Sequence, residues 1–205
     1  FELEYQLIGT SKENKLDEIK EIIKRSTFTY VRQQKMLGLG DAILTGEPLI
    51  GNEPFAVILA DDLCDSSDGV ITQMIEIYNQ YKCSIVAIEE VSKDQTNQYG
   101  IIAGKKIGNS NDTYLVTDMV EKPDIIDAPS NLAIIGRYIL TPDIFNILKN
   151  ILPGKNGEIQ ITDALLQQAK KGKVIAYQFR GKRFDCGSIE GYLKATNHFA
   201  KKNSS

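Results

Sequence analysis

Residues 55 to 91 contain a strand-length apolar run, a helical stretch and a second apolar run. FAVILA (55–60) is continuously apolar, DGVITQMIEIYNQYK (68–82) has apolar residues at helical spacing, and CSIVAIEEV (83–91) is rich in β-branched residues. A continuous apolar run is typical of a strand that is buried on both faces of a parallel sheet. Strand, helix and strand within about 35 residues make a βαβ unit with a right-handed crossover. The predicted fold class is α/β.

Further strands and helices are predicted on both sides of this unit. The additional strands are TFTYVRQ (27–33), YGIIAGKKIG (99–108), TYLVTDMVEK (113–122), NLAIIGRYIL (131–140) and VIAYQFRG (174–181). The additional helices lie within residues 1–23, from Asp41, and after the expected caps Thr141, Thr162 and Ser188. Residues 99–121 are expected to form an antiparallel β-hairpin excursion. Because no linker or repeat interrupts the pattern, residues 1–205 are predicted to form a single domain.

The composition narrows the class of protein. With 205 residues, of which 42% are hydrophobic, the chain can bury a sizeable core. Lys and Arg number 24 against 27 Asp and Glu, so a basic surface for nucleic acid is not expected. The three cysteines lack a paired spacing, which disfavours disulfides and structural zinc and favours a cytoplasmic location. No apolar run approaches the roughly 18 residues of a transmembrane helix, so no membrane partner is predicted.

Two adjacent acids, Asp61 and Asp62, directly follow the FAVILA run. In open α/β sheets, ligands bind beyond the carboxyl ends of the strands, where the loops diverge. Carboxylates in that position suit Mg²⁺, which commonly takes one or two of them together with substrate phosphates. The local sequence equally allows the pair to cap the loop or helix that follows. Both interpretations stay open at this point.

Three further segments contain residues suited to a nucleotide or phosphate. Glu121 and Lys122 end a predicted strand, where a lysine can neutralise phosphate and a glutamate can accept sugar hydroxyls. Asp185 follows the last predicted strand and is a candidate second carboxylate for one metal ion. Gln33 and the backbone at Gly38 are suited to hydrogen bonding with a base edge. Taken alone, the first pair fits an exposed salt-bridged turn better, and Asp185 also fits a turn.

The order of these motifs resembles the sugar-1-phosphate nucleotidyltransferases, in particular their bacterial uridylyltransferase members. The resemblance covers nearly the whole chain and rests on FELE, VRQ followed by GLGDA, PFAVILADD, QYGII, VEKP, APSNLAIIGRYIL, GEIQITDAL and FDCG. It implies a Rossmann-like mixed, mostly parallel sheet flanked by helices, of the nucleotide-diphospho-sugar transferase type. It also implies a Mg²⁺-dependent reaction in which UTP and glucose 1-phosphate give UDP-glucose and pyrophosphate.

The resemblance further implies a role for each candidate residue. Asp62 is expected only to cap the following loop, because uridylyltransferases typically place an apolar residue there. The hairpin over residues 99–121 is expected beside the sugar site. The implied roles are metal binding for Asp61 and Asp185, sugar-phosphate binding for Lys122, uracil contacts for Gln33 and Gly38, glucose-hydroxyl contacts for Glu121 and the Tyr99–Gly100 turn, and positions bordering the sugar pocket for Asn131 and Glu158.

The chain departs from the family pattern at its start. Family members open with a first strand and a glycine-rich loop that hold the triphosphate, and neither is present in this sequence. The chain is therefore expected to be an N-terminally truncated form that lacks about 80 residues and is inactive alone. The alternatives are a dTTP-dependent or other sugar-1-phosphate nucleotidyltransferase, or a non-catalytic nucleotide-sugar-binding module. Because family members commonly self-associate, a homo-oligomer is a further expectation.

Overall fold

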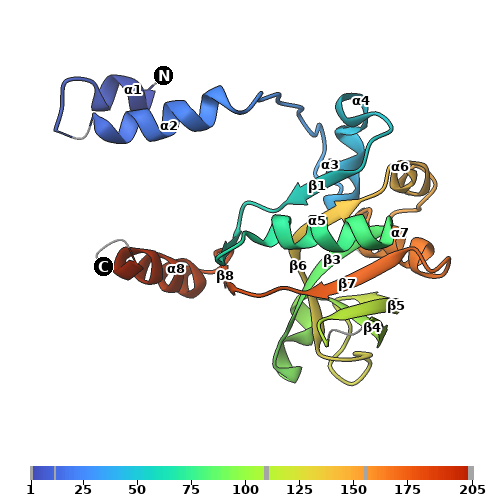
Figure 1. The fold of residues 1–205 in the computed structure, drawn as a ribbon. Helices are drawn as coiled ribbons and strands as arrows, with labels where there is room; N and C mark the ends of the chain where they lie inside the picture. Colours follow the sequence, from blue (N-terminus) through green and yellow to red (C-terminus); the bar gives the residue numbers. More distant parts are fainter. Residues whose placement is uncertain (1, 12, 109–110, 155–156, 203–205) are drawn as a thin grey trace. The chain divides into compact units, whose positions relative to one another are not determined.

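The computed structural model describes residues 2–11, 13–108, 111–154 and 157–202. Their contacts divide the chain into two compact units, Phe1–Arg32 and Gln33–Ser205. The first unit holds helices α1 (Glu2–Leu7) and α2 (Asn14–Lys24) (Figure 1). Leu16 of α2 is buried, but Ile22 and Ile23 are 61% and 54% exposed within this chain. The single-domain organisation over residues 1–205 stays a prediction.

The segment TFTYVRQ (27–33) does not form the predicted strand. Residues 26 to 33 have no regular secondary structure, and Phe28 and Tyr30 are exposed. An alternating pattern stabilises a strand only where a neighbouring strand and a core face receive it. In the described part of the chain, no strand pairs with this segment. The prediction was therefore wrong because local β propensity had no tertiary partner.

The Gln33–Ser205 unit is built on a six-stranded mixed sheet with the order β1-β6-β3-β7-β5-β4, in which β4 also pairs with β6. The antiparallel pairing of β4 with β5 joins the two strands of the expected hairpin, whose residues 109–110 lie outside the described residues. The strands of this sheet are β1 (Phe55–Ile58), β3 (Ser84–Glu90), β4 (Gly100–Lys106), β5 (Thr113–Glu121), β6 (Leu132–Leu140) and β7 (Val174–Gln178).

The expectation of a mostly parallel sheet is wrong for the described residues. Only β3 and β7 pair in parallel, and the other pairings are antiparallel. β1 and β3 both run antiparallel to β6, so they point the same way, as a βαβ unit requires. However, β6 lies between them as their common neighbour. A strand from much later in the chain thus separates the first two strands of this sheet in sequence order.

The position of β1 also differs from the prediction. Among the described strands, β1 pairs with β6 alone and therefore forms an edge of the sheet. Its residues alternate between partly buried and exposed, and Ile58 is 57% exposed. The apolar run FAVILA predicted burial on both faces. The apolar composition of a segment indicates that it tends to be buried, but it does not indicate which strands lie beside it.

Helices cover both faces of the sheet. One hydrophobic cluster packs the sheet against α3, α6 and α7, and a second packs its other face against α5 (Figure 1). In β3, Val86 and Ile88 belong to the first cluster and Ile85 and Ala87 to the second, and all four are fully buried. The α/β class and the mixed sheet flanked by helices are thus confirmed.

The helices of this unit largely follow the predicted pattern. Ser188 caps the last helix as predicted, because its hydroxyl accepts a hydrogen bond from the Gly191 N–H (3.1 Å). Thr162 instead lies inside its helix, and its hydroxyl serves a different contact, described below. The helices are α3 (Leu39–Thr45), α4 (Glu47–Ile50), α5 (Val70–Tyr81), the 3₁₀ helix η1 (Lys93–Gln98), α6 (Asp143–Leu148), α7 (Ile161–Ala169) and α8 (Ile189–Lys202).

A two-stranded antiparallel ribbon joins segments far apart in the sequence and was not predicted. Asp62 is the Cα partner of Asp185, so both side chains and that of Arg183 share one face of the ribbon. Phe184 lies on the other face, where its ring stacks on His198 of α8 with centroids 4.8 Å apart. The ribbon thus connects α8 with a group of charged residues. Its strands are β2 (Asp62–Asp65) and β8 (Lys182–Asp185).

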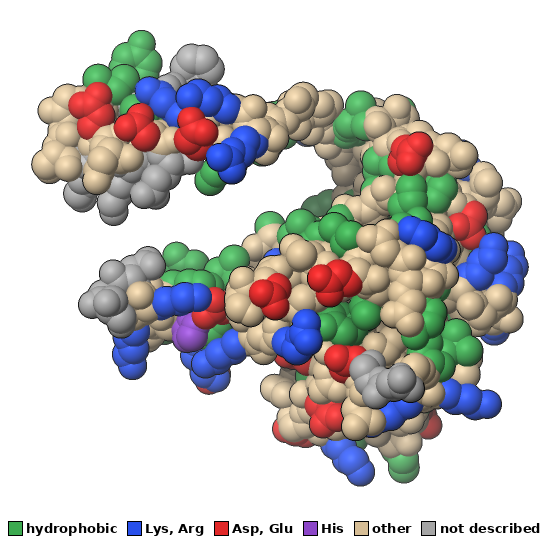
Figure 2. Space-filling view, in the orientation of Figure 1, with side chains coloured by type: hydrophobic (Ala, Val, Ile, Leu, Met, Phe, Trp, Pro, Cys, Tyr) green, Lys and Arg blue, Asp and Glu red, His purple; other side chains and the backbone are tan. Residues whose placement is uncertain are grey.

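The lengths of the helices and the charges on the surface indicate whether a membrane or a nucleic acid is a suitable partner. No helix in the described residues is long and apolar enough to cross a bilayer. On the face of the Gln33–Ser205 unit seen in Figure 2, the basic and acidic side chains of the described residues are interspersed. The visible part of this unit therefore does not present the continuous positive charge with which proteins bind nucleic acid.

Candidate active site

A cavity of about 420 Å³ in the Gln33–Ser205 unit collects most of the predicted site residues. Its walls come from the segment after β1, the start of β4, the end of β5, the start of α7 and the end of β8. These segments are far apart in sequence, and only the sheet topology brings them together. The predicted residues that line the cavity are Gly38, Asp61, Tyr99, Gly100, Glu121, Lys122, Glu158 and Asp185.

Two carboxylates face each other across Gly187. A Cβ atom built on Gly187 would lie 3.1 Å from Asp185 Oδ1 and 3.5 Å from Asp61 Oδ2. The two oxygens are therefore separated by no more than the sum of these two distances. The Cys186 N–H also donates a hydrogen bond to the Asp61 backbone carbonyl (2.7 Å), which fixes the two segments against each other. The structure thus places Asp61 and Asp185 around one small space.

Asp62 is buried and paired, unlike Asp61 before it. Asp61 is exposed at the cavity, whereas Asp62 is only 6% exposed. Its Oδ2 accepts a hydrogen bond from the Gly136 N–H (2.9 Å), and its Oδ1 forms an ion pair with Arg183. The expectation that Asp62 caps the following loop is therefore wrong. Asp62 belongs to a buried ion pair that joins β2, β6 and β8.

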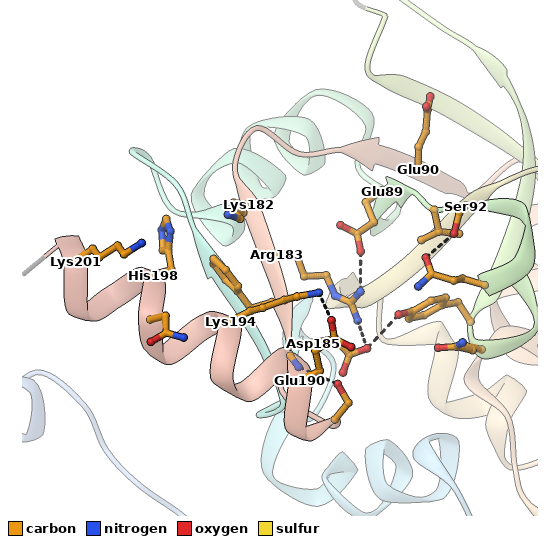
Figure 3. A pocket seen from close by; sticks show the side chains of 18 residues that line it. Glu89, Glu90, Ser92, Lys182, Arg183, Asp185, Glu190, Lys194, His198 and Lys201 are labelled. Carbon is orange, nitrogen blue, oxygen red and sulfur yellow. Dashed lines mark hydrogen bonds and ion pairs between the residues drawn. The ribbon is translucent and has the colours of Figure 1, made fainter.

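Arg183 is the central charge of the site, and no pattern in the sequence indicated its role. Its guanidinium binds Asp62, Glu89 (2.6 Å) and Asp185 (3.1 Å), and it lies 5.1 Å from the centre of the Tyr99 ring. Figure 3 shows this guanidinium between Glu89 and Asp185. Burial lowers the pKa of Arg183, but the Tyr99 hydrogen bond and the Asp62 carboxylate outweigh that effect and raise it. Arg183 is thus held in the charged form.

The Tyr99 hydroxyl points at a carboxylate of the site. It donates a hydrogen bond to Asp185 Oδ2 (3.1 Å), the oxygen that Arg183 also contacts. Burial raises the pKa of Tyr99, so the hydroxyl keeps its proton as a donor. The sequence resemblance implied that the Tyr99–Gly100 turn contacts a sugar, and in this structure the hydroxyl is engaged by Asp185 instead.

The Glu121 side chain is partly withdrawn from water at the end of β5. Its Oε2 accepts a hydrogen bond from the Thr162 hydroxyl (3.1 Å). A Cβ on Gly100 would lie 2.8 Å from Thr162 Cγ2 and 3.2 Å from Glu121 Oε2, so this close approach requires glycine. Burial raises the pKa of Glu121, which the Thr162 hydroxyl and the Lys122 charge only partly oppose. A glutamate in this position can accept hydrogen bonds from a ligand.

Lys122 has an unusual backbone conformation. Its φ is +43°, in the left-handed region that residues other than glycine rarely adopt. Its backbone N–H donates to the Tyr99 carbonyl (3.0 Å), and this bond maintains the turn. Strained backbone of this kind is concentrated at functional sites. The turn places Lys122 on the cavity wall directly after Glu121.

The glycine segment before α3 contacts the loop before α7. The Gly40 N–H donates to the Ile159 carbonyl (2.9 Å), and the Ile159 N–H donates to the Leu37 carbonyl (2.7 Å). Gly38 has φ +90°, and a Cβ there would lie 3.0 Å from Glu158 Cβ. Glycine therefore allows the two loops to approach closely. This contact brings Gly38 and Glu158 to the same cavity wall.

Two predicted residues lie outside the cavity lining. Gln33 donates through Nε2 to Asp41 Oδ2 (2.7 Å) and to the Gly38 carbonyl (3.2 Å). Asn131 donates to the Val91 carbonyl (3.2 Å) and thus holds the end of β3 beside the start of β6. Gln33 therefore lies next to a cavity residue, whereas the Asn131 amide is used within the protein framework.

A second cavity of about 860 Å³ adjoins the first (Figure 3). The residues that line both cavities are Gln98, Tyr99, Arg183 and Asp185. The second cavity is otherwise bounded by the end of β3, η1 and one side of α8. Arg183, Tyr99 and Asp185 thus form a shared wall between the two spaces.

The donor chemistry of the first cavity fits a hard divalent cation. In the described parts of the chain, no group of three or more His, Cys, Asp or Glu side chains is arranged to hold a metal. Asp61 and Asp185 nevertheless offer two carboxylates, and Mg²⁺ commonly takes one or two carboxylates and completes its shell with water and phosphate oxygens. The site thus suits a metal that a phosphorylated substrate helps to bind.

The combined arrangement suits phosphoryl chemistry on a hydroxyl-rich substrate. Two carboxylates can hold a cation, Lys122 can neutralise a phosphate, and Glu121 can accept sugar hydroxyls. The chain contains a single histidine, His198 of α8. It contacts Asp65 of β2 (2.6 Å) and does not line the first cavity. The geometry therefore supports catalysis by positioning and charge neutralisation.

Comparisons with known proteins agree with this geometry. The family model described as nucleotidyl transferase matches residues 6–202. A UTP–glucose-1-phosphate uridylyltransferase of Pseudomonas aeruginosa is 60% identical over 207 residues, covering 98% of this chain and 74% of that protein. A similar enzyme of Staphylococcus saprophyticus is 43% identical over 100% of this chain and 70% of that protein. The chain thus spans roughly three quarters of the length of these relatives.

Solved structures show the same similarity. Apo UDP-glucose pyrophosphorylase superposes with a TM-score of 0.91 at 60% identity, covering 99% of this chain and 74% of that one. UDP-glucose pyrophosphorylase in complex with UDP-glucose gives a TM-score of 0.88 at 61% identity, covering 95% and 74%. The UTP-bound enzyme of Acinetobacter baumannii gives 0.82 at 37% identity, covering 97% and 69%. The chain belongs to the nucleotidyl transferase family, among the UTP–glucose-1-phosphate uridylyltransferases.

Proposed function

We propose that this chain carries the site at which the uridylyl group of UTP is transferred to glucose 1-phosphate to form UDP-glucose and pyrophosphate, although these 205 residues alone are expected to be inactive. The observation that carries the proposal is the single cavity in which Asp61 and Asp185 share a small space and Lys122 and Glu121 line the wall. Relatives that are 60% identical bear the name of this activity, and a structure at 61% identity holds UDP-glucose.

Asp61 and Asp185 are the residues that would hold Mg²⁺. Asp185 Oδ1 and Asp61 Oδ2 border the same space, and both belong to hard carboxylate donors. When bound, Mg²⁺ offsets the negative charge on the phosphate oxygens. Lys122 would add a second positive charge at the phosphate of the sugar. The protein thereby reduces the repulsion between two polyanionic substrates.

The reaction requires no covalent intermediate with the protein. A phosphate oxygen of glucose 1-phosphate attacks the α-phosphorus of UTP, and a new P–O bond forms. The bond between the α-phosphorus and the bridging oxygen breaks in line with it, and pyrophosphate leaves with the electron pair. The task of the side chains is to align the two phosphates, and alignment of this kind accounts for much of the acceleration in such reactions.

Glu121, Gly100 and Glu158 would form the sugar part of the site. Glu121 keeps one acceptor oxygen for a ligand, since the Thr162 hydroxyl contacts Oε2. Gly100 leaves room beside it, because any Cβ would enter this space. The Tyr99 and Asn131 side chains act within the protein framework in this structure, and their backbone carbonyls also accept hydrogen bonds there, from the Lys122 and Val91 N–H groups.

Gly38 and Gln33 would contact the uracil base. Gln33 Nε2 is occupied by Asp41 and by the Gly38 carbonyl, so the side chain offers its amide oxygen as an acceptor for the uracil N–H. Thymine presents the same N–H and adds a methyl group. The selection of UTP over dTTP must therefore depend on space around the methyl group or on contacts to the ribose 2′-hydroxyl, which dTTP lacks. The three cysteines are free, which supports a reducing, cytoplasmic setting.

Calorimetry with the 205-residue chain tests the proposal. UDP-glucose in the presence of Mg²⁺ should bind, and two substitutions should each weaken binding at least about 10-fold: Lys122→Ala because a charged contact to phosphate is lost, and Asp61→Asn because a Mg²⁺ ligand is lost. dTDP-glucose should compete less well than UDP-glucose. An absence of UDP-glucose binding would contradict the proposal. Pyrophosphate release from UTP and glucose 1-phosphate is not expected from these 205 residues alone, and turnover at a rate normal for an enzyme would contradict that expectation.

A further inference from the structure

Arg183 is buried beside Asp185, one of the two proposed metal ligands. Its side chain is 6% exposed, and its three guanidinium nitrogens each contact a different carboxylate. Nε binds Asp62, Nη1 binds Glu89 (2.6 Å) and Nη2 binds Asp185 (3.1 Å). A single planar group therefore sets the relative positions of three acids from β2, β3 and β8.

The two oxygens of Asp185 have different partners. Oδ2 accepts hydrogen bonds from Arg183 Nη2 and from the Tyr99 hydroxyl, both at 3.1 Å. Oδ1 accepts a hydrogen bond from the Gly187 N–H (3.1 Å) and faces the space it shares with Asp61. The two oxygens of a carboxylate are equivalent, so these contacts do not choose between them. By holding one oxygen, Arg183 and Tyr99 instead set the plane and direction of the carboxyl group, so that the other oxygen lies beside Asp61.

The charges around Arg183 agree with these contacts of Asp185. Four carboxylates gather here: Asp61, Asp62, Glu89 and Asp185. Arg183 pairs with three of them, and the nearby buried Arg137 donates to backbone carbonyls, including that of Asp62, and to none of these carboxylates. Negative charge therefore remains in excess on the side of the cavity, where Asp61 and Asp185 Oδ1 face each other. A divalent cation is the complementary ligand.

We propose that Arg183 is a positioning residue for nucleotidyl transfer, which holds Asp185 Oδ2 so that Oδ1 faces Asp61 across the cation-binding space. Tyr99 assists from the other side through its hydroxyl. The inference rests on the proposed function, because it assigns the two aspartates as metal ligands. Partners that orient a metal-binding side chain are commonly worth a factor of about 10 to 100 in metal affinity.

Mn²⁺ binding measured by electron paramagnetic resonance tests the inference without turnover. Free Mn²⁺ gives a signal that is lost on binding, so titration in the presence of UDP-glucose gives the affinity of the site. Arg183→Lys keeps the charge but cannot donate to three carboxylates at once. We expect it to weaken Mn²⁺ binding by about 10-fold or more. Tyr99→Phe, which keeps the ring, should weaken it by about 2-fold to 10-fold.

A second variant keeps the test valid if Arg183→Lys does not fold. Arg183→Met combined with Asp62→Asn removes the buried pair together, so that no charge is left without its partner in β2. Folding of each variant is checked by circular dichroism and thermal unfolding. The same weakening of Mn²⁺ binding is expected from this variant, because Asp185 Oδ2 again loses its guanidinium contact.

Lys182→Met is the matched control. Lys182 precedes Arg183 in β8 and carries the same charge, but its ammonium lies 5.0 Å from the centre of the Phe184 ring and contacts no proposed ligand. Mn²⁺ affinity should stay within about 2-fold of the parent, since Coulomb effects at exposed sites are small. Folded Arg183 variants that bind Mn²⁺ as tightly as the parent would overturn the positioning role alone. Failure of the parent to bind both UDP-glucose and Mn²⁺ would overturn the proposed function and this inference together.

Discussion

The Gly136 N–H in β6 donates a hydrogen bond to Asp62 Oδ2 in β2, at 2.9 Å. The contact is so close that a Cβ on Gly136 would lie 2.4 Å from that oxygen and 2.6 Å from Leu59 Cβ. The buried aspartate and the central strand thus meet at a point where only glycine fits. This point supports the ribbon that carries the proposed catalytic acids.

Gly136→Ala should therefore destabilise the fold. The methyl group forces β2 away from β6, and overpacking of this kind costs about 1–3 kcal/mol of unfolding free energy. Urea unfolding followed by circular dichroism measures the change. Gly154→Ala is the control, because its Cβ would meet nothing closer than 3.8 Å, and it should cause no comparable loss. Equal stabilities of the two variants would show that the contact with Asp62 can relax.

Asp61→Asn and Asp62→Asn should separate cation binding from stability. Asp61 is exposed and faces Asp185, so Asp61→Asn should abolish Mn²⁺ binding and change stability by less than about 0.5 kcal/mol. Asp62 is buried against Arg183, so Asp62→Asn should cost about 3 kcal/mol of unfolding free energy. Urea unfolding and Mn²⁺ titration of both variants provide the comparison. Similar effects of the two substitutions would refute the separate roles.

Glu121→Gln should change how stability depends on pH. Burial raises the pKa of Glu121, so the folded chain binds this proton more tightly than the unfolded chain does. Ionisation of Glu121 therefore lowers stability as the pH rises above about 4.5, its ordinary pKa. We expect Glu121→Gln to be more stable than the parent at pH 7, with a smaller difference near pH 4.

Thr162→Val gives the complementary comparison for Glu121. The Thr162 hydroxyl favours the charged carboxylate, so its loss should raise the pKa of Glu121 further and reduce stability most at neutral pH. Thermal unfolding across the pH range measures both variants. A stability difference between Glu121→Gln and the parent that does not vary with pH would contradict the assignment.

Lys122→Gly should separate backbone strain from phosphate binding. The positive φ at Lys122 favours glycine, so Lys122→Gly should be about 1 kcal/mol more stable than Lys122→Ala, which keeps the strained backbone. Both variants should lose affinity for UDP-glucose equally, since both lack the ammonium group. Urea unfolding and calorimetry test the two effects. A less stable glycine variant would show that the turn is not strained.

The sequence indicated which residues share a cavity better than it indicated the sheet. Asp61, Lys122 and Asp185 were singled out because each lies at or after the end of a predicted strand, and strand ends are where an α/β fold places ligands. The order of the strands in the sheet could not be predicted in the same way. FAVILA has the apolar character of an interior strand, yet β1 lies at an edge among the described strands. Pairing depends on contacts between distant segments, which hydrophobicity alone does not encode.

Arg183 illustrates a second limit of sequence reasoning. In KRFDCGS it appears as one of two adjacent basic residues, a pattern typical of a solvated surface. Its burial follows from Asp62 and Glu89, which lie far from it in the sequence, and from Asp185, two residues along its own strand. Thr162 is similar, since a threonine near a helix start usually caps it, whereas here the hydroxyl binds Glu121. Polar residues reveal such roles only through their tertiary partners.

The pairing of β2 with β8 makes the length of the last loop a determinant of the chemistry. Because side chains alternate along a strand, a one-residue shift of β8 against β2, caused by a deletion in the 179–181 connection between β7 and β8, would turn Arg183 toward α8. Phe184 would then point into the charged cluster. Among related sequences, insertions and deletions should consequently be rare in this short stretch, even where individual residues around it vary.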